Sequence, residues 1–110
     1  MADFATYDDF FAFYLREHSK PATRTMHFVG TTLTLVLILG AIFGGRPVLL
    51  VGALFSGYGF AWVSHFFIEK NRPATFKYPL RSFVSDWKMW ALMLSGRIGP
   101  ALDRAGVKAA

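Results

Sequence analysis

The sequence predicts an all-α membrane protein, in which a two-helix transmembrane hairpin is flanked by amphipathic helices at the membrane interface. Two segments without any Lys, Arg, Asp or Glu lie between Arg24 and Arg46 and between Arg46 and Glu69. Each is close to the roughly 20 apolar residues that an α-helix needs to cross a hydrocarbon core of about 30 Å. The turn that joins them, from Gly44 to Pro47, is too short for anything but an antiparallel pair.

The composition indicates a single small membrane domain spanning residues 1–110. Hydrophobic residues make up 54% of the chain and charged residues 17%. A soluble domain of this size could not bury so much apolar surface, whereas a bilayer can cover it. The absence of cysteine excludes disulfides and thiolate metal sites. The first 24 residues lack a long apolar segment and contain several acids, so we expect no signal peptide.

Residues 4–18 are expected to form an amphipathic helix. Thr6 is a candidate N-cap, and two aspartates follow in the first turn, where the helix dipole favours acidic side chains. Residues at three- and four-residue spacing form one stripe, which consists of Phe4, Tyr7, Phe11, Tyr14 and His18. We expect this helix to lie in the interface or across the cytoplasmic mouth of the hairpin.

Residues 24–43 are expected to form the first transmembrane helix. Pro21 is assigned to the preceding turn because proline interrupts a continuous helix, and Thr23 is a candidate cap. A polar and small stripe follows one face of this helix and consists of His27, Thr31, Thr34, Ile38 and Ala41. The other faces carry Leu, Val, Ile and Phe, as contact with lipid requires.

Residues 48–69 are expected to form the second transmembrane helix. Small residues precede His65 at strict four-residue spacing, namely Ala53, Gly57 and Ala61. Small residues at this spacing let two helix backbones approach closely, so the stripes of the two helices should meet. Because the helices are antiparallel, His27 and His65 should lie at the same membrane depth.

Residues 79–95 are expected to form a second amphipathic helix at the interface, after a polar loop. Pro79 suits the first turn of a helix. The apolar face carries two tryptophans, which are typical anchors at a membrane interface. Charged residues on the other faces argue against full insertion, and Asp86 is expected to face water or pair with a neighbouring basic residue. We expect the tail from Arg97 to be weakly structured.

The formal net charge of +5 is distributed on both sides of the hairpin, whereas the turn inside it has only Arg46. By the positive-inside rule we expect both termini to be cytoplasmic, in a bacterial inner membrane or, in a eukaryote, in the endoplasmic reticulum. Basic residues beside a membrane also attract anionic lipid headgroups. The chain has no motif from the nucleic-acid-binding repertoire, so we assign it no nucleic-acid partner.

The three histidines of the chain, His18, His27 and His65, all fall at the predicted cytoplasmic surface. Three imidazole nitrogens with open coordination positions suit non-haem iron or catalytic zinc. Glu69 follows His65 by four residues and would share its face if the helix continues. The alternative is ordinary packing of histidines at an interface, and no compact metal motif decides between the two hypotheses.

Two stretches resemble the Mpo-like family of small membrane proteins, which includes the fungal 2-hydroxy fatty acid dioxygenase. The first, residues 13–31, is similar to the family pattern Tyr-Leu-x-x-His, a polar linker and His-x-x-Gly, matched by Tyr14, Leu15, His18, Arg24, His27 and Gly30. The second, residues 59–86, is similar to the pattern His-x-x-x-Glu followed by Arg-Pro-Ala, matched by His65, Glu69, Arg72, Pro73 and Ala74. The chain lacks the Asn-rich linker and the additional hydrophobic segments of the longer members.

The resemblance implies an iron(II)-dependent dioxygenase that uses dioxygen to shorten a 2-hydroxy fatty acid by one carbon, as in fatty acid alpha-oxidation. It implies that His18, His27 and His65 are the metal ligands. It also implies a catalytic role for Glu69, as a fourth ligand or as a partner of the ligands. Iron(II) is the expected metal, with zinc as the second choice.

The resemblance and the predicted topology together suggest how a substrate would bind. Its acyl chain would lie in the bilayer, while its carboxylate and 2-hydroxyl would reach the histidines and chelate the metal beside dioxygen. Arg72 is the candidate catalytic cation for the carboxylate, and Arg24 and Lys77 are the candidate substrate-binding cations.

Two other functions compete with this one. A non-catalytic membrane scaffold or lipid-binding module would oligomerise through the small-residue helix faces and bind headgroups through its basic flanks. A zinc-dependent hydrolase of lipids would use the same histidines. A dioxygenase requires the three histidines within about 5 Å of one another, whereas a scaffold does not. We also expect a homo-oligomer, because a lone hairpin has little core.

Overall fold

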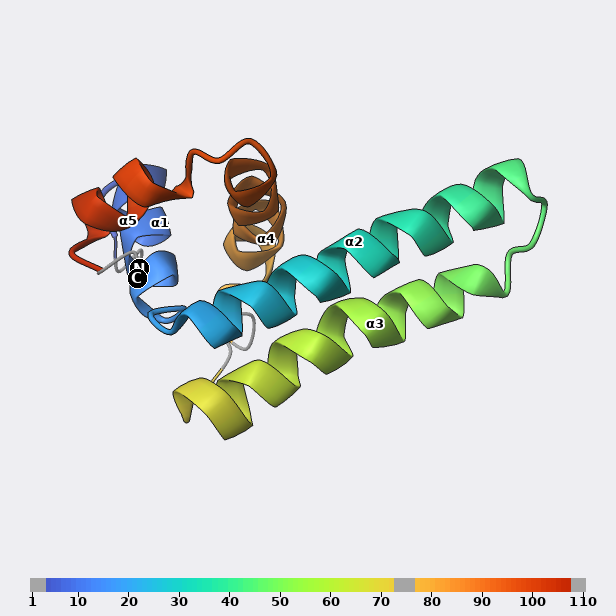
Figure 1. The fold of residues 1–110 in the computed structure, drawn as a ribbon, viewed down its shortest axis with the longest axis horizontal. Coiled ribbons are helices and arrows are strands. Elements are labelled where there is room, and N and C mark those ends of the chain that lie inside the picture. The colour runs from blue at the N-terminus through green and yellow to red at the C-terminus, as the bar shows by residue number, and fades with distance from the viewer. Residues whose placement is uncertain (1–3, 73–76, 108–110) are drawn as a thin grey trace.

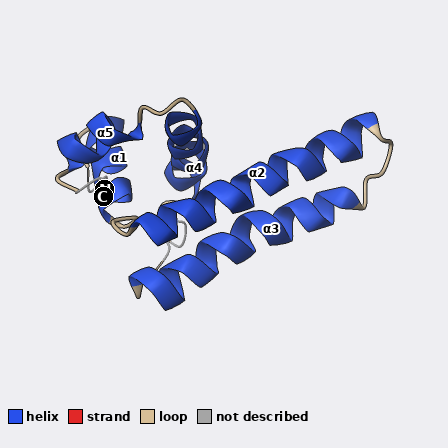
Figure 2. Cartoon of the chain, in the orientation of Figure 1, coloured by secondary structure: helices blue, strands red, loops and turns tan. Residues whose placement is uncertain are grey.

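The computed structural model describes residues 4–72 and 77–107, and these residues contain helices and no strand (Figure 2). The elements in order are α1 (Tyr7–Arg16), α2 (Pro21–Phe43), α3 (Leu49–Val63), the π-helix η1 (Ser64–Glu69), α4 (Pro79–Leu94) and α5 (Ile98–Ala105). We call α2, α3 and η1 the hairpin, and α1, α4 and α5 the head. The head packs on one end of the hairpin (Figure 1). The predicted all-α fold is confirmed.

α2 begins three residues earlier than expected. We assigned Pro21 to a turn and began the helix at residue 24, but Lys20 is the N-cap and Pro21 occupies the first helical turn. Proline is tolerated there because the first N–H groups of a helix have no acceptor within the helix. After Phe43 the chain reverses through Gly45, whose φ of +64° is readily adopted by glycine.

The hairpin helices touch through small and hydroxyl-bearing residues, which confirms that their stripes meet. Gly30 leaves no room for a side chain, because a Cβ there would lie 2.7 Å from the Cβ of Phe60. Thr34 Oγ1 lies 2.8 Å from the Gly30 carbonyl oxygen, 3.1 Å from that of Ala53 and 3.0 Å from Ser56 Oγ. The interior of the hairpin is therefore polar and closely packed.

The outer surface of the hairpin is apolar. Pro21–Phe43 and Leu49–Glu69 are long and apolar enough to cross a membrane, and only 17% and 22% of their most hydrophobic windows are buried inside the protein. The core helix of a soluble protein would be mostly buried. Here large side chains such as Val36, Ile42 and Phe55 are exposed, and an apolar surface of this extent marks contact with lipid or with another protein.

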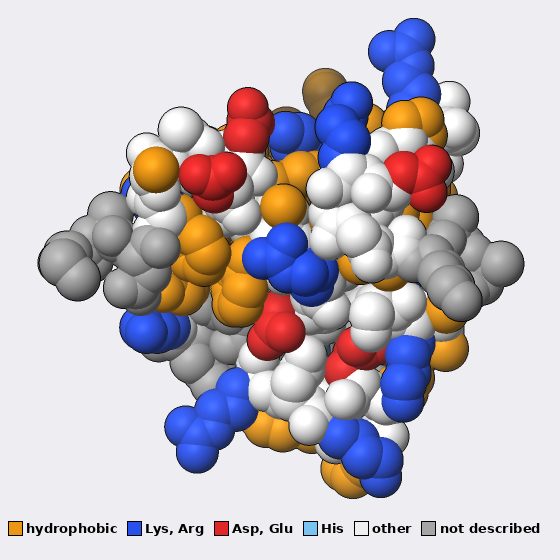
Figure 3. Space-filling view, turned by 90° about the vertical axis from the view of Figure 1, so that its left-hand side faces the viewer, with side chains coloured by type: hydrophobic (Ala, Val, Ile, Leu, Met, Phe, Trp, Pro, Cys, Tyr) orange, Lys and Arg blue, Asp and Glu red, His pale blue; other side chains and the backbone are white. Residues whose placement is uncertain are grey.

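The head has the opposite arrangement. Its apolar core is formed by Phe10, Phe11, Tyr14, Leu15, Met89, Ala101, Leu102, Ala105 and Val107. Charged side chains of both signs lie on the end of the molecule that faces away from the hairpin turn (Figure 3). Thr6 caps α1 as predicted, with its hydroxyl accepting a hydrogen bond from the Asp9 amide.

α5 corrects a prediction. We expected a weakly structured tail from Arg97, but Ile98–Ala105 is helical. Ala101, Leu102 and Ala105 are buried where α5 packs on α1. The prediction was wrong because a segment this short, which contains a glycine and a proline, has little helical propensity of its own. Packing of its apolar face stabilises it instead.

α4 turns its serine face inward. Ser82, Ser85 and Met89 are buried, whereas most of its large aliphatic side chains are exposed. Trp90, which we expected to be an interface anchor, donates a hydrogen bond from Nε1 to Thr32 Oγ1 at 2.9 Å. This bond ties α4 to α2, and α4 packs beside α2 on the side opposite α3 (Figure 1).

Candidate metal centre

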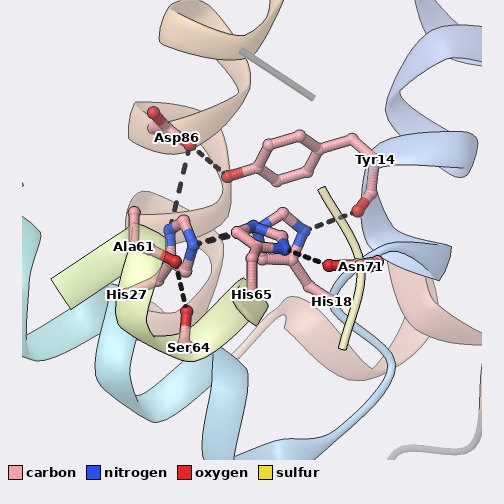
Figure 4. Close-up of polar contacts among 8 residues, drawn as sticks. All are labelled: Tyr14, His18, His27, Ala61, Ser64, His65, Asn71 and Asp86. Carbon is pink, nitrogen blue, oxygen red and sulfur yellow. Dashed lines mark hydrogen bonds and ion pairs between the residues drawn. The ribbon is translucent and has the colours of Figure 1, made fainter. Parts of the chain in front are cut away.

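The three histidines meet where the head joins the hairpin (Figure 4). His18 lies in the connection between α1 and α2, His27 in α2 and His65 in η1, and all three are buried. The Nε2–Nε2 distances are 3.1 Å for His18–His27, 3.3 Å for His27–His65 and 3.0 Å for His18–His65. His27 and His65 thus lie at the same level of the antiparallel hairpin, as expected, and their common membrane depth stays a prediction. The three ligand atoms lie within 4.8 Å of one another, as a metal site requires.

Two of the histidines are oriented by hydrogen bonds from their other ring nitrogen. His18 Nδ1 donates to the carbonyl oxygen of Tyr14 at 2.7 Å. His65 Nδ1 donates to Asn71 Oδ1 at 2.7 Å. The Asn71 amide is held in this orientation because its Nδ2 donates to the carbonyl oxygen of Glu17 at 3.1 Å.

The third histidine faces a carboxylate. His27 Nδ1 lies 3.9 Å from Asp86 Oδ1, and Asp86 also accepts a hydrogen bond from the Tyr14 hydroxyl. Burial raises the pKa of Asp86 to about 6, and the bond from Tyr14 opposes this rise. A carboxylate behind a metal-binding imidazole orients the ring and increases its basicity. Our expectation that Asp86 faces water or pairs with a basic residue is wrong, because the packing of α4 on α2 places it behind His27.

These contacts determine the tautomers of at least two histidines. A carbonyl oxygen can only accept, so the neutral rings of His18 and His65 carry their protons on Nδ1 and present unprotonated Nε2 atoms. The two Nε2 lone pairs are 3.0 Å apart, and His27 can donate a proton to only one of them. A cation between the three nitrogens would replace this repulsion with coordination.

The donor set fits a divalent transition metal. Burial lowers the pKa of His18 well below its ordinary value, and His27 and His65 lower it further; a metal binds the neutral ring. With metal–nitrogen distances of about 2.1 Å, two ligands are about 3.0 Å apart at a right angle and about 3.4 Å apart at the tetrahedral angle. The observed separations, from 3.0 to 3.3 Å, lie within this range.

A change of helix type sets the position of His65. The chain continues from α3 into a π-helix at Ser64, and π-helical turns are frequent at functional sites. Lys70 then adopts a left-handed φ of 61°, and the backbone N–H of Asn71 donates to the His65 carbonyl oxygen at 2.9 Å. The same reversal brings the Asn71 side chain to the imidazole. We did not predict a role for Asn71, because an α-helix was expected through residue 69.

Glu69 does not join the histidines. It would share the face of His65 in a continuous α-helix, but the wider π-helical turn changes that register. Its carboxylate accepts hydrogen bonds from Ser19 Oγ at 2.8 Å, the Lys20 amide at 2.7 Å and Thr23 Oγ1 at 2.9 Å. Glu69 therefore caps the start of α2 and links the two ends of the hairpin.

Arg24 holds the connection that carries His18. Its side chain is buried, and Nη1 donates to the carbonyl oxygens of His18 at 2.8 Å and Ser19 at 3.0 Å. The other two cations predicted to hold a substrate carboxylate, Arg72 and Lys77, are exposed. Between these two cations, Pro73 and Ala74 of the second sequence motif lie outside the described residues.

Comparison with known proteins identifies one family. The family model described as Mpo1-like, "2-hydroxy-palmitic acid dioxygenase Mpo1-like", matches residues 4–98. This range contains the three histidines and the residues that face their Nδ1 atoms, Tyr14, Asn71 and Asp86. No curated protein and no solved structure matches the chain.

Proposed function

Because this chain belongs to the Mpo1-like family, we propose that it is an iron-dependent dioxygenase that acts on 2-hydroxy fatty acids in lipid alpha-oxidation. The observation that carries the proposal is the convergence of the three Nε2 atoms within 3.3 Å of one another. The Nδ1 hydrogen bonds of His18 and His65 leave the Nε2 lone pairs of these two rings available to a metal, and His27 Nδ1 lies 3.9 Å from a carboxylate oxygen. Such a buried arrangement is costly without a cation.

His18, His27 and His65 hold the metal in this proposal. Their three neutral nitrogens would bind a divalent transition metal without filling its coordination sphere. The dioxygenase name of the family favours iron(II) over zinc. Iron(II) bound there supplies the activation of dioxygen, for which the protein's own side chains have no equivalent.

The reaction shortens the substrate by one carbon. The bond between its carbons 1 and 2 breaks, and carbon 2 becomes the new carboxyl carbon. One 2-hydroxy acid and one dioxygen give the shortened acid, carbon dioxide and water, which balances atoms and electrons.

The side chains around the metal centre orient the ligands. The Tyr14 carbonyl oxygen and Asn71 hold the rings of His18 and His65 by hydrogen bonds, and Asp86 lies beside the ring of His27. The interactions of Glu69 and Arg24 hold the start of α2 and the connection before it. These residues keep the three Nε2 atoms close together before the metal binds, so the protein would not need to rearrange on binding. Arg72 and Lys77, which are exposed, attract the substrate carboxylate towards this end of the molecule.

We further propose that the hairpin spans a membrane and that both termini are cytoplasmic. The exposed apolar surface of α2 and α3 supports insertion. The hairpin turn has Arg46 as its single charged residue, whereas several Lys, Arg, Asp and Glu side chains are spread over the end formed by the head (Figure 3). The metal centre then lies at the interface, at the depth where the carboxylate of a membrane-dissolved fatty acid is found.

The competing scaffold hypothesis relied on small-residue faces for oligomerisation. In the structure Thr34 contacts Ala53 and Ser56 of the same chain, and Gly30 packs against Phe60. The hairpin therefore uses these faces within one chain, which weakens the argument for the scaffold. A homo-oligomer stays a prediction.

Metal analysis and turnover test the proposal together. Protein purified in detergent and loaded anaerobically should contain about one iron per chain, as three ligands around a single centre imply. On addition of 2-hydroxypalmitate and oxygen it should release the acid shortened by one carbon. His18→Ala, His27→Ala and His65→Ala should each lose both properties, whereas the surface variant Ser95→Ala should keep them.

Three outcomes would contradict the proposal. Native protein that stays metal-free after anaerobic loading with iron or zinc would exclude a metal enzyme and leave the lipid-binding scaffold. Preferential binding of zinc, with hydrolysis of a lipid ester and no oxygen consumption, would favour the hydrolase. Iron that is bound equally by all three histidine variants would place the metal elsewhere.

A further inference from the structure

A cavity of about 270 Å³ adjoins the metal centre. His27 of α2 and Asp86 of α4 line one end of it, and these two side chains lie side by side in Figure 4. From there the lining continues along α2 through Thr31, Thr34 and Ile38, and along α3 through Gly57, Leu54 and Leu50. Because the two helices are antiparallel, Ile38 and Leu50 both lie at the end that is far from the histidines.

The lining is polar at one end and apolar at the other. His27 and Asp86 are the histidine and the carboxylate of the lining, and both belong to the metal centre. The Thr34 hydroxyl is engaged by the Gly30 carbonyl oxygen within the hairpin. Farther along, the walls are aliphatic. A cavity of this kind fits an amphiphile that has one polar head and one apolar chain.

The length of the cavity indicates the size of that chain. His27 and Ile38 are eleven residues apart on one helix, which corresponds to about 16 Å along its axis. An extended chain advances about 1.2 Å per single bond, as extended polypeptide does. An extended chain has about 13 bonds over this distance, so a chain of about 14 carbons that starts beside His27 reaches the level of Ile38.

We propose that this cavity binds the acyl chain of the 2-hydroxy fatty acid and that Ile38 and Leu50 set the preferred chain length. The identity of the head group rests on the proposed function. The cavity, which we also call the groove, is defined by its lining residues and does not depend on that function. Leu50 and Leu54 are half-exposed or more, so the groove is open along α3. A fatty acid dissolved in the membrane would enter sideways through this opening.

Photocrosslinking tests where the chain lies. The probe is 2-hydroxypalmitate with a diazirine near its last carbon, added to the full chain in phospholipid nanodiscs, with and without iron. We expect labelling at Ile38 and Leu50, and labelling at Thr34 and Gly57 when the diazirine is at mid-chain. A phospholipid with the same diazirine in its acyl chain should instead label the outer face of the hairpin, for example Val36 and Phe55.

Matched variants test the length selectivity. Leu50→Trp should reduce labelling by the 16-carbon probe about tenfold and leave a 12-carbon probe unchanged, since two or more methylene groups lose their contacts. Val36→Trp places the same side chain on the exposed side of α2 and should change neither. Leu50 is half-exposed, so the larger side chain does not require repacking of a core.

The outcomes distinguish a failure of the acyl-chain site from a failure of the proposed dioxygenase activity. Labelling in the groove by metal-free protein supports the groove even if no turnover is detected. Labelling confined to the outer face, or equal labelling of the groove by the phospholipid probe, would overturn the groove, and turnover measured in parallel would still support the dioxygenase. A Leu50→Trp variant that binds both chain lengths like the native protein would overturn the assignment of the length-setting residues.

Discussion

The head and the hairpin bury opposite kinds of residue. In the head, α1 and α5 enclose aromatic and aliphatic side chains, such as Phe10 and Leu102, whereas α4 buries two serines beside Met89. The hairpin encloses glycine, threonine and serine, and exposes its valine, leucine and phenylalanine side chains. The same chain of 110 residues thus follows two packing rules, one suited to water and the other suited to an apolar solvent.

This difference shows why the metal centre lies where it does. At the junction of the two regions, the buried side chains are mostly polar, and they come from both regions. His18 comes from the connection between α1 and α2, whereas His27 and His65 come from the hairpin. The junction is therefore held by hydrogen bonds and, in our proposal, by a metal.

Metal removal should have the largest effect, because the metal joins the two regions. At a free iron(II) concentration about 1,000 times its dissociation constant, binding should stabilise the folded protein by about 4 kcal/mol. This corresponds to a rise in Tm of about 15 °C for a domain of this size. Thermal unfolding in detergent, with and without a chelator, measures the shift. The His18→Ala variant should show no shift, and a full shift in that variant would remove His18 from the ligand set.

Truncation of an apolar residue should affect the two regions very differently. Leu102 is 1% exposed in the core of the head, so Leu102→Ala should cost about 3 kcal/mol of unfolding free energy. Val36 is 58% exposed on the hairpin, so Val36→Ala should cost less than about 0.5 kcal/mol in detergent. Denaturant titration of both variants provides the comparison. Equal losses would show that the outer face of the hairpin is packed against something, such as a second copy of the chain.

Addition of a methyl group, in contrast to truncation, should destabilise the hairpin more than the head. A Cβ at Gly30 would lie 2.7 Å from Phe60 Cβ and 3.0 Å from the Ser56 carbonyl oxygen, so Gly30→Ala should cost about 2 kcal/mol by separating α2 from α3. At Gly99 in the head, a Cβ would meet no atom within 4 Å, so Gly99→Ala should be neutral or stabilise α5 by up to about 1 kcal/mol. The same denaturant titration measures both. A neutral Gly30→Ala would mean that the hairpin helices do not pack this closely.

The pH dependence of stability should reveal Asp86 at the junction. Its folded-state pKa of about 6 is above the ordinary value of 3.8. Between these values the folded protein therefore holds more protons than the unfolded chain, and stability falls as the pH rises through this window. Asp86→Asn removes the titration and should gain about 1.4 kcal/mol relative to the native protein between pH 5 and pH 7.5. Metal-free protein in detergent is the sample to compare, and a difference that is constant with pH would show that Asp86 titrates normally.

Part of the candidate site follows from sequence spacing. The charge-free lengths of the two spans and the short turn between them require an antiparallel pair, and this geometry brings His27 and His65 to one level. The stripe in residues 4–18 ends at His18, which the sequence placed at the same surface. The helix α5 could also have been predicted from sequence spacing, because Ile98, Ala101 and Leu102 are spaced as residues on one face of a helix.

The sequence by itself therefore determined the helices of the hairpin, their pairing and the meeting of the histidines, because these depend on periodicity and length along the chain. Only the tertiary structure decided which residues support the imidazoles. Asn71 depends on a π-helix and on the left-handed Lys70, and Asp86 depends on how α4 docks on α2. Glu69 caps α2 for the same reason. These choices arise from contacts between residues far apart in the chain, and local propensity contains no information about such contacts.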